Sequence, residues 1–436
     1  MRLARLAILL LVACCTLPST TFAQRKVDPR RAAKIGIRKL SGQHLRLYTD
    51  LPASKAVDEL PRVFDAAVPQ WAKYFGIPAA RVADWRIQGY LMQDRTKFAA
   101  LGLLPKENPE FVNGFASGHE LWLEEQPSDY YRRHLLLHEG THCFMNTQLG
   151  GSGPGWYREG MAELLGTHHW DGRQLQLRYL PARRDEVPMW GRSKLIRAAF
   201  RNGKALTLPA VLAIDGRRQW STEQYAWTWA LAQFLDSHPR YQEKFRELSS
   251  AVSDRRFNQR FRQEFRDQWS DLLVEWQAFV ATLDYGYDAK RMAMQHQTAR
   301  SVAEDPQTVS IAADRGWQST GWLLQAGQTY RITAVGRYQI AFDTAPWPCE
   351  PGGVTLDYHD GHPLGMLLGA LRPEANSSPS ASKGQDADAD FQHPMAIGLQ
   401  ATLAPRHDAV LYLRVNDSPA RLADNQGTLQ ATILRQ

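Results

Sequence analysis

The pentapeptide His138-Glu139-Gly140-Thr141-His142 restricts the fold of this chain most, because its two histidines act together only on a helix. Apolar residues surround it at 135–137 and 143–144, so we predict a helix over 130–145 with Ser128 or Asp129 as its N-cap. Residues four apart lie on one helix face. His138 and His142 would therefore offer imidazole nitrogens to one ion, with Glu139 beside it.

This arrangement suits metal-assisted hydrolysis. Zinc lowers the pKa of a bound water, a carboxylate such as Glu139 takes its proton, and two histidines leave room for a third protein ligand and an open position. The sequence thus predicts a Zn²⁺ site with His138 and His142 as ligands and Glu139 as general base. The alternative is a buried helix whose histidines only form hydrogen bonds.

The third ligand is expected downstream. Metzincin spacing would need Gly at 145 and His at 148, but the chain has Met145 and Gln148. A glycine-rich turn over 150–155 leads instead into a second predicted helix, 156–165. Such a turn lets two helices pack antiparallel, which would bring Glu159 over the histidine pair.

Together, H-E-x-x-H and W-x-x-E-G-x-A-E resemble the gluzincin metallopeptidases, specifically the peptidase-MA-like bacterial families related to thermolysin and aminopeptidase N. The resemblance implies an α+β thermolysin-like catalytic domain, a peptide or protein substrate, and Glu159 as the third zinc ligand. Glu163 lies one turn further along the same face, and we expect it to orient a ligand histidine. Ligation by Glu163 in place of Glu159 is the alternative.

The resemblance implies further parts of such a site. Related families carry a tyrosine at the start of a downstream helix, which points to Tyr225 as a donor to the oxyanion, with simple core packing as the alternative. They also present an edge strand to the substrate; we expect the run 119–123 to be that strand, unless it is an interior one. His134 is too far along the helix to reach the same ion, and we expect it to be partly exposed.

The last third of the chain has a different pattern. Residues 329–335, 409–415 and 428–434 alternate apolar and polar side chains, which predicts an all-β sandwich. The loop at 416–427 gathers oxygen ligands of the kind that calcium prefers.

Residues 308–436 resemble the bacterial galactose-specific calcium lectins of the PA-IL type. That resemblance implies Ca²⁺ held by the side chains of Asp417, Asp424 and Asn425 and the carbonyl of Arg421, and a carbohydrate or glycoprotein as partner. A strand-joining turn without metal is the alternative.

The domain organisation follows from these segments. A basic start and a short apolar run predict a signal peptide over 1–23 cleaved after Ala23, with lipid attachment at Cys14 as the alternative. We then expect a metallopeptidase domain over 24–295, a linker over 296–307 and a lectin-like domain over 308–436. No later run approaches the length needed to span a bilayer, so we expect a secreted or periplasmic protein without a transmembrane segment.

Charge adds little. The chain has 52 basic and 45 acidic side chains, a net charge of +7 spread along its length, so we expect no nucleic-acid partner. The sequence therefore favours a secreted zinc peptidase with a C-terminal carbohydrate-binding-like module. The alternative is a carbohydrate-binding adhesin whose zinc domain is structural or inactive.

Overall fold

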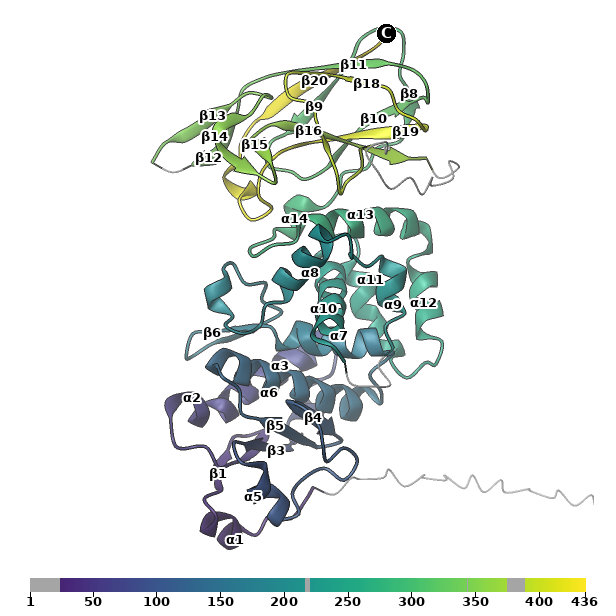
Figure 1. Cartoon of the computed structure of the whole chain (residues 1–436). Helices are drawn as coiled ribbons and strands as arrows, with labels where there is room; N and C mark the ends of the chain where they lie inside the picture. Colours follow the sequence, from purple (N-terminus) through teal and green to yellow (C-terminus); the bar gives the residue numbers. More distant parts are fainter. Residues whose placement is uncertain (1–23, 216–219, 343, 375–388) are drawn as a thin grey trace, which may run out of the picture.

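The computed structural model of the chain describes residues 24–215, 220–342, 344–374 and 389–436. The predicted signal peptide and the alternative lipid anchor at Cys14 lie outside these ranges. The described residues form a mixed α and β N-terminal part followed by a β-rich C-terminal part (Figure 1). No helix in the described ranges is long and apolar enough to cross a membrane.

The N-terminal part begins with a sheet whose strand order is β1-β2-β3-β5-β4. Its three central strands run parallel, and the two outer strands pair antiparallel with their neighbours. The strands are β1 (Arg38–Ser41), β2 (Leu45–Thr49), β3 (Ile87–Met92), β4 (Gly114–Ser117) and β5 (Glu120–Glu124).

One expectation about this sheet was wrong. The run 119–123 contributes to β5, which is an interior strand between β3 and β4, so it cannot be the edge strand. The edge is β4, because a tight turn at Gly118, with φ of 56°, folds the preceding residues back onto β5. Alternation alone does not tell which strand of such a hairpin lies outermost.

Two long helices cover one face of the sheet. They are α3 (Leu60–Tyr74) and α6 (Asp129–Phe144), and the Ser128 side chain caps α6 by accepting from Tyr131 N at 3.1 Å. A Cβ atom at Gly140 would lie 2.8 Å from the Trp71 ring, so a glycine inside the H-E-x-x-H motif is what allows α3 to approach. The smaller helices are α1 (Pro29–Lys34), α2 (Lys55–Asp58), α4 (Ala79–Val82) and α5 (Arg95–Ala100).

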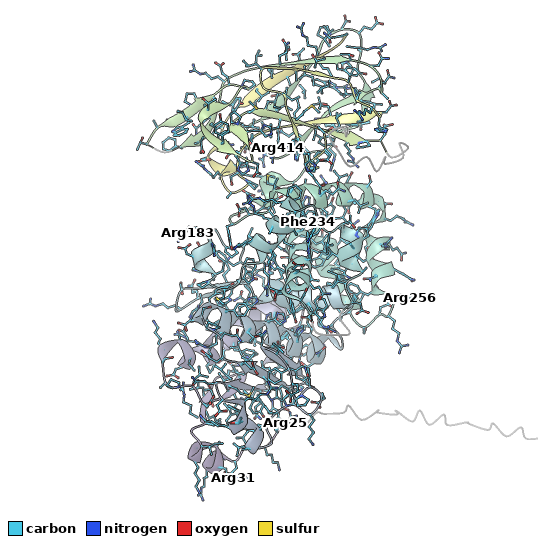
Figure 2. All side chains as sticks on the ribbon, in the orientation of Figure 1. Arg25, Arg31, Arg183, Phe234, Arg256 and Arg414 are labelled. Atoms are coloured by element: carbon cyan, nitrogen blue, oxygen red, sulfur yellow. The ribbon has the colours of Figure 1, made fainter. Side chains whose placement is uncertain are left out.

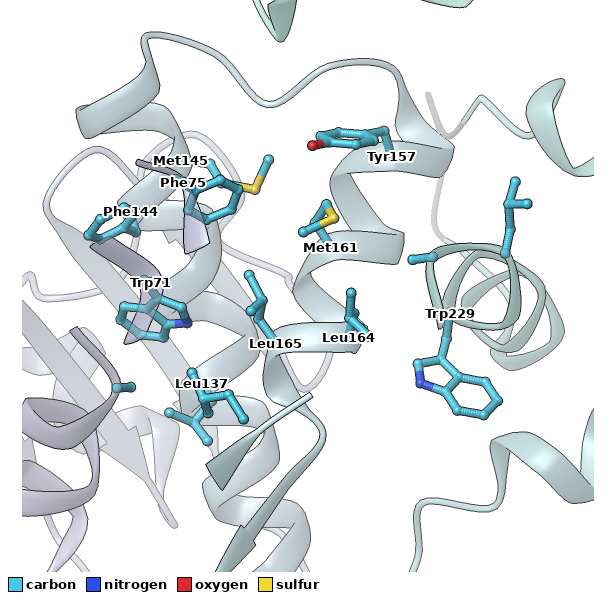
Figure 3. Close-up of a cluster of buried hydrophobic side chains, with 14 of the residues drawn as sticks. Trp71, Phe75, Leu137, Phe144, Met145, Tyr157, Met161, Leu164, Leu165 and Trp229 are labelled. Atoms are coloured by element: carbon cyan, nitrogen blue, oxygen red, sulfur yellow. The ribbon is translucent and has the colours of Figure 1, made fainter. Parts of the chain in front are cut away.

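The chain then reverses and becomes helical. A π-helical turn over Met145–Leu149 ends at Gly150, with φ of 74°, and α7 (Gly155–Gly166) returns along α6. Apolar side chains of α3, α6, α7 and α10 (Thr222–Ser237) fill the space between them (Figure 3). The other helices here are α8 (Arg192–Arg201), α9 (Leu208–Leu212), α11 (Gln242–Glu247), α12 (Phe257–Glu264), α13 (Trp269–Thr282) and α14 (Ala289–Met292).

The C-terminal part is built from two sheets with strand orders β17-β16-β19-β10-β8 and β18-β11-β20-β9, and a separate apolar core lies between them. The predicted strands appear as β11 (Tyr330–Val335), β19 (Ala409–Val415) and β20 (Thr428–Arg435). The other strands of the two sheets are β8 (Arg300–Ser301), β9 (Gln307–Ala312), β10 (Gln318–Leu324), β16 (Leu367–Pro373), β17 (Met395–Ala396) and β18 (Gln400–Leu403). Two short hairpins complete the C-terminal part, namely β12 (Tyr338–Phe342) with β13 (Pro346–Cys349), and β14 (Val354–His359) with β15 (His362–Leu364). A third, β6 (His168–Trp170) with β7 (Leu175–Leu177), follows α7 in the N-terminal part.

The two parts are in direct contact. Arg372 of β16 pairs with Asp271 of α13 at 2.7 Å. His296, on the segment that joins the parts, lies 2.9 Å from Glu275 Oε1 of α13 and 2.7 Å from the Tyr412 hydroxyl of β19. Ion pairs and hydrogen bonds thus fasten the β-rich part onto α13.

Candidate metal centre

Three predicted ligand atoms converge between α6 and α7. His138 Nε2 and His142 Nε2 lie 3.2 Å apart, and Glu159 Oε2 lies 3.3 Å from each of them. All three side chains are buried, with exposed fractions of 5, 9 and 6%. They form a group that could hold a metal ion.

The charges in this group favour a cation at its centre. Burial lowers the pKa of His138, but hydrogen bonds to Glu159 and Glu163 outweigh that effect and raise the pKa well above its usual value. Burial raises the pKa of Glu159, and the attraction of His142 and His138 reverses this and holds the pKa well below its usual value. An ionised, buried carboxylate beside two imidazoles is the electrostatic setting in which a metal ion replaces protons.

Glu163 lies on the far side of the first histidine. Its Oε1 is 3.4 Å from His138 Nδ1, the ring nitrogen opposite the one that faces Glu159. Arg192, at the start of α8, donates to both carboxylate oxygens of Glu163 at 2.9 Å, and both residues are buried. This bidentate pair fixes the carboxylate, and through it the orientation of the His138 ring.

The expectation for His134 was wrong. The residue is 1% exposed, and its Nε2 lies 3.5 Å from Glu163 Oε2. It forms a second group with His138 and Glu163 that could hold a metal ion. Periodicity placed His134 on the helix, but α7 packs against the face that it occupies.

Glu139 points towards the edge strand β4. A Cβ atom built on Gly114 would overlap Glu139 Oε1 and lie 3.0 Å from its Cδ and Cγ atoms, so the two residues are in contact. Glu139 is 6% exposed, and burial raises the pKa of its carboxyl. The carboxylate thus lies between the histidine helix and one face of β4, the edge strand with which an extended chain could pair.

Tyr225 reaches the same centre from α10. Its ring centroid is 5.9 Å from that of His138, and the Arg192 guanidinium lies 5.9 Å from the Tyr225 ring. Burial, together with the nearby Glu159 and Glu139, raises the pKa of the Tyr225 phenol. The hydroxyl therefore keeps its proton and is available as a hydrogen-bond donor.

A glycine on α7 determines how closely α10, the helix that carries Tyr225, packs against α7. A Cβ atom at Gly160 would lie 2.7 Å from the Thr228 carbonyl oxygen of α10. Only glycine lets the two backbones approach so closely. The sequence pattern did not predict that Gly160 permits this close approach. It also did not predict the role of Arg192, because that residue belongs to no motif and its position along the chain does not indicate a partner.

The predicted calcium residues occupy the loop between β19 and β20. Asp417 and Asn425 are buried, and Asp417 Oδ2, Asp424 Oδ1 and Asn425 Oδ1 are buried without a hydrogen-bond partner in the described part of the chain. Burial raises the pKa of Asp417 to about 6. The Arg421 carbonyl accepts from Asp424 N at 3.3 Å, at the start of the short helix Leu422–Asp424. Unpartnered oxygens of this kind fit an oxygen-preferring cation.

No protein-family model matches the chain, and no curated protein matches it. Among solved structures, the chain is similar to the N-terminal domain of EclA, described as a PllA-like lectin, with 17% identity and a TM-score of 0.21 over 30% of this chain and 95% of that one. It is also similar to PliG, a periplasmic inhibitor of g-type lysozyme from Aeromonas hydrophila, with 14% identity and a TM-score of 0.18 over 33% and 100% of the two chains. TM-scores this low assign neither a fold nor an activity to the chain.

Proposed function

We propose that this chain is a secreted or periplasmic zinc-dependent peptidase with a thermolysin-like, gluzincin-type N-terminal part. The observation that carries the proposal is the triangle of His138 Nε2, His142 Nε2 and Glu159 Oε2, with sides of 3.2, 3.3 and 3.3 Å. Ligands about 2.0–2.1 Å from a tetrahedral ion stand about 3.3–3.4 Å apart, so the triangle has the size of a zinc site with its fourth position open.

The surrounding residues supply what peptide hydrolysis needs. Zinc, when bound, acidifies water and polarises a carbonyl group. Glu139, whose pKa burial raises, takes up a proton from the attacking water and passes it to the leaving amine. The Tyr225 phenol donates to the oxygen on which negative charge develops. An extended peptide pairs with β4 beside Glu139.

Glu159, and not Glu163, is the proposed third ligand. Glu159 lies on the Nε2 side of both histidines, whereas Glu163 lies on the Nδ1 side of His138 and has both oxygens engaged by Arg192. Glu163 therefore acts by orienting His138.

The test begins with the zinc-loaded full chain and a broad peptide library read by mass spectrometry. Hydrolysis of some peptides is expected, and Glu139→Gln should reduce it by about 10³-fold or more while zinc stays bound, because both the base and its charge are lost. Glu243→Gln, an exposed exchange of the same kind on α11, serves as the matched control. Cleavage that survives Glu139→Gln contradicts the proposed mechanism.

The same experiment separates the alternative, a carbohydrate-binding adhesin with a structural zinc domain. Such a protein would retain zinc and cleave nothing, and Glu139→Gln would leave all its properties unchanged. The contact between Glu139 and the edge strand β4 favours the peptidase, because a structural zinc site does not need a carboxylate there.

We further propose that the C-terminal part is a calcium-dependent carbohydrate-binding module. The supporting observation is the set of buried oxygens of Asp417, Asp424 and Asn425 that have no hydrogen-bond partner among the residues that the structure describes. Calcium should raise the melting temperature of the full chain relative to chelator, and Asp417→Asn should reduce the increase. A glycan array with and without calcium tests sugar binding. Identical melting curves would mean that the loop is an ordinary turn.

A further inference from the structure

A cavity of about 370 Å³ lies at the junction of the two parts, away from the candidate zinc site and beside the loop that carries the candidate calcium ligands. The end of α8 forms one wall, and β19 and the segment before β17 form the other. Figure 2 shows Arg414 on the side of the C-terminal sheets that faces the helices. The residues that matter for its chemistry are Arg197, Phe200, Arg201, Phe391, Arg414 and Asn416.

Arg414 carries a buried positive charge that forms no ion pair with any of the residues that the structure describes. The side chain is 4% exposed, and its Nε atom is buried with no hydrogen-bond acceptor in the ranges that the structure describes. The guanidinium lies 5.0 Å from the Trp317 ring, and Asp360 and Asp417 attract it. Burial lowers the pKa of Arg414. A buried guanidinium without a hydrogen-bonded anion is costly, and such a group is stabilised when a carboxylate binds it.

Further arginines at the cavity come from the other part of the chain. Arg201 ends α8 and is exposed at the rim. Arg197, one turn earlier, pairs with Asp284 and lies 3.9 Å from Asp360. The cavity therefore has cationic groups on both walls, and Asp360, which also lines it, is the acidic group beside Arg197.

Asn416 adds an acceptor to the same cavity. Its Nδ2 group donates to the carbonyl oxygens of His359, His362 and Pro363 at 3.0–3.1 Å, which fixes the orientation of the amide. Its Oδ1 atom is buried without a partner among the described residues. A ligand hydroxyl would satisfy this oxygen, while Phe200 and Phe391 offer apolar surface to a ring.

We propose that this cavity binds a hydroxylated carboxylate of monosaccharide size, such as a uronic acid, with its carboxylate on Arg414 and a hydroxyl on Asn416. A planar guanidinium matches a carboxylate with two parallel hydrogen bonds, and the cavity volume is in the range that small ligands occupy. The site combines residues of both parts of the chain, so the ligand would bind only when the β-rich part is docked on α8 and α13. It does not depend on the proposed peptidase activity.

The test uses the full chain with sodium glucuronate as the probe and glucose as the neutral control at matched ionic strength. Glucuronate should raise the melting temperature by mass action, and glucose should not. Arg414→Lys keeps the charge but loses the planar fork, and it should weaken glucuronate binding in calorimetry by about tenfold. Arg201→Gln should also weaken binding, and the exposed Arg173→Gln in the β6–β7 hairpin should not.

The following outcomes overturn the proposal. One is the absence of glucuronate binding, or binding that Arg414→Met and Arg201→Gln both leave unchanged. Another is equal stabilisation by sodium acetate, which would contradict the assignment to a hydroxylated ligand. A third is a ligand-free Arg414→Met protein that unfolds at a lower temperature than the wild type, which would mean that the guanidinium is part of the core. The expected result is unfolding at the same or a higher temperature, because the variant buries no charge.

Discussion

Replacing Gly114 by alanine should disable the proposed base without removing the metal. The new Cβ atom would overlap Glu139 Oε1 and lie 3.0 Å from its Cδ and Cγ atoms. Restoring ordinary van der Waals separation requires the carboxylate to move by roughly 1 Å. Because the overlapping atom is the end of a flexible side chain, the fold should accommodate this shift at little cost. A misplacement of about 1 Å in a reacting group can reduce turnover about 10²-fold.

The assay compares hydrolysis of a library-selected peptide by the wild type and by Gly114→Ala, together with zinc content and melting temperature. Hydrolysis should fall by about 10²-fold while zinc content stays unchanged, since His138, His142 and Glu159 are not touched. Gly352→Ala is the matched control, because its added Cβ atom meets only Leu399 at 3.7 Å. Full activity in Gly114→Ala would refute this placement of Glu139, and loss of zinc would show that β4 supports the ligands themselves.

Three further predictions concern buried charges. Glu159→Ala should remove most of the zinc affinity, whereas Glu163→Ala should lower it only about 10–100-fold. The measurement is the metal content of each variant after dialysis. A larger loss of zinc in Glu163→Ala than in Glu159→Ala would mean that Glu163 is the ligand. In buffer with chelator, Arg192→Met should lower the free energy of unfolding measured by urea titration by about 3–5 kcal/mol, because the buried Glu163 carboxylate loses its partner. The exposed Arg183→Met should change the free energy of unfolding little. Equal effects of the two substitutions would contradict this reasoning. Burial raises the pKa of the Glu275 carboxyl, but hydrogen bonds from two histidines, His238 and His296, lower it to about 2. The ionised carboxylate therefore stabilises the fold by about 3 kcal/mol above the unfolded-state pKa of about 4.3. This stabilisation is lost as the pH falls towards 2. Glu275→Gln should flatten this dependence in unfolding curves, and an unchanged slope would refute it.

Much of the architecture could be predicted from local pattern. The helix over 130–145 and the strands over 329–335, 409–415 and 428–434 were predicted to within about two residues, because apolar periodicity and capping residues act locally. The convergence of His138, His142 and Glu159 was also expected, since an i, i+4 pair on one helix and a tight glycine turn leave few arrangements.

What required the tertiary structure was contact between distant segments. Arg192, 29 residues after Glu163, meets it only because α8 packs beside α7. The edge strand proved to be β4 because the turn at Gly118 folds the hairpin outward. His134 is buried because α7 covers its face of α6. Arg414 meets Arg201 across one cavity only through the docking of the two parts.

The sequence by itself therefore determined the helix that carries the two histidines and the glutamate, since residue spacing along one helix fixes which side chains share a face. The three-dimensional packing decided which carboxylate faces Nε2 and which faces Nδ1 of His138, which strand borders Glu139, and which buried charges are left to find a partner. These are properties of pairs separated by tens to hundreds of residues, and no local periodicity encodes them.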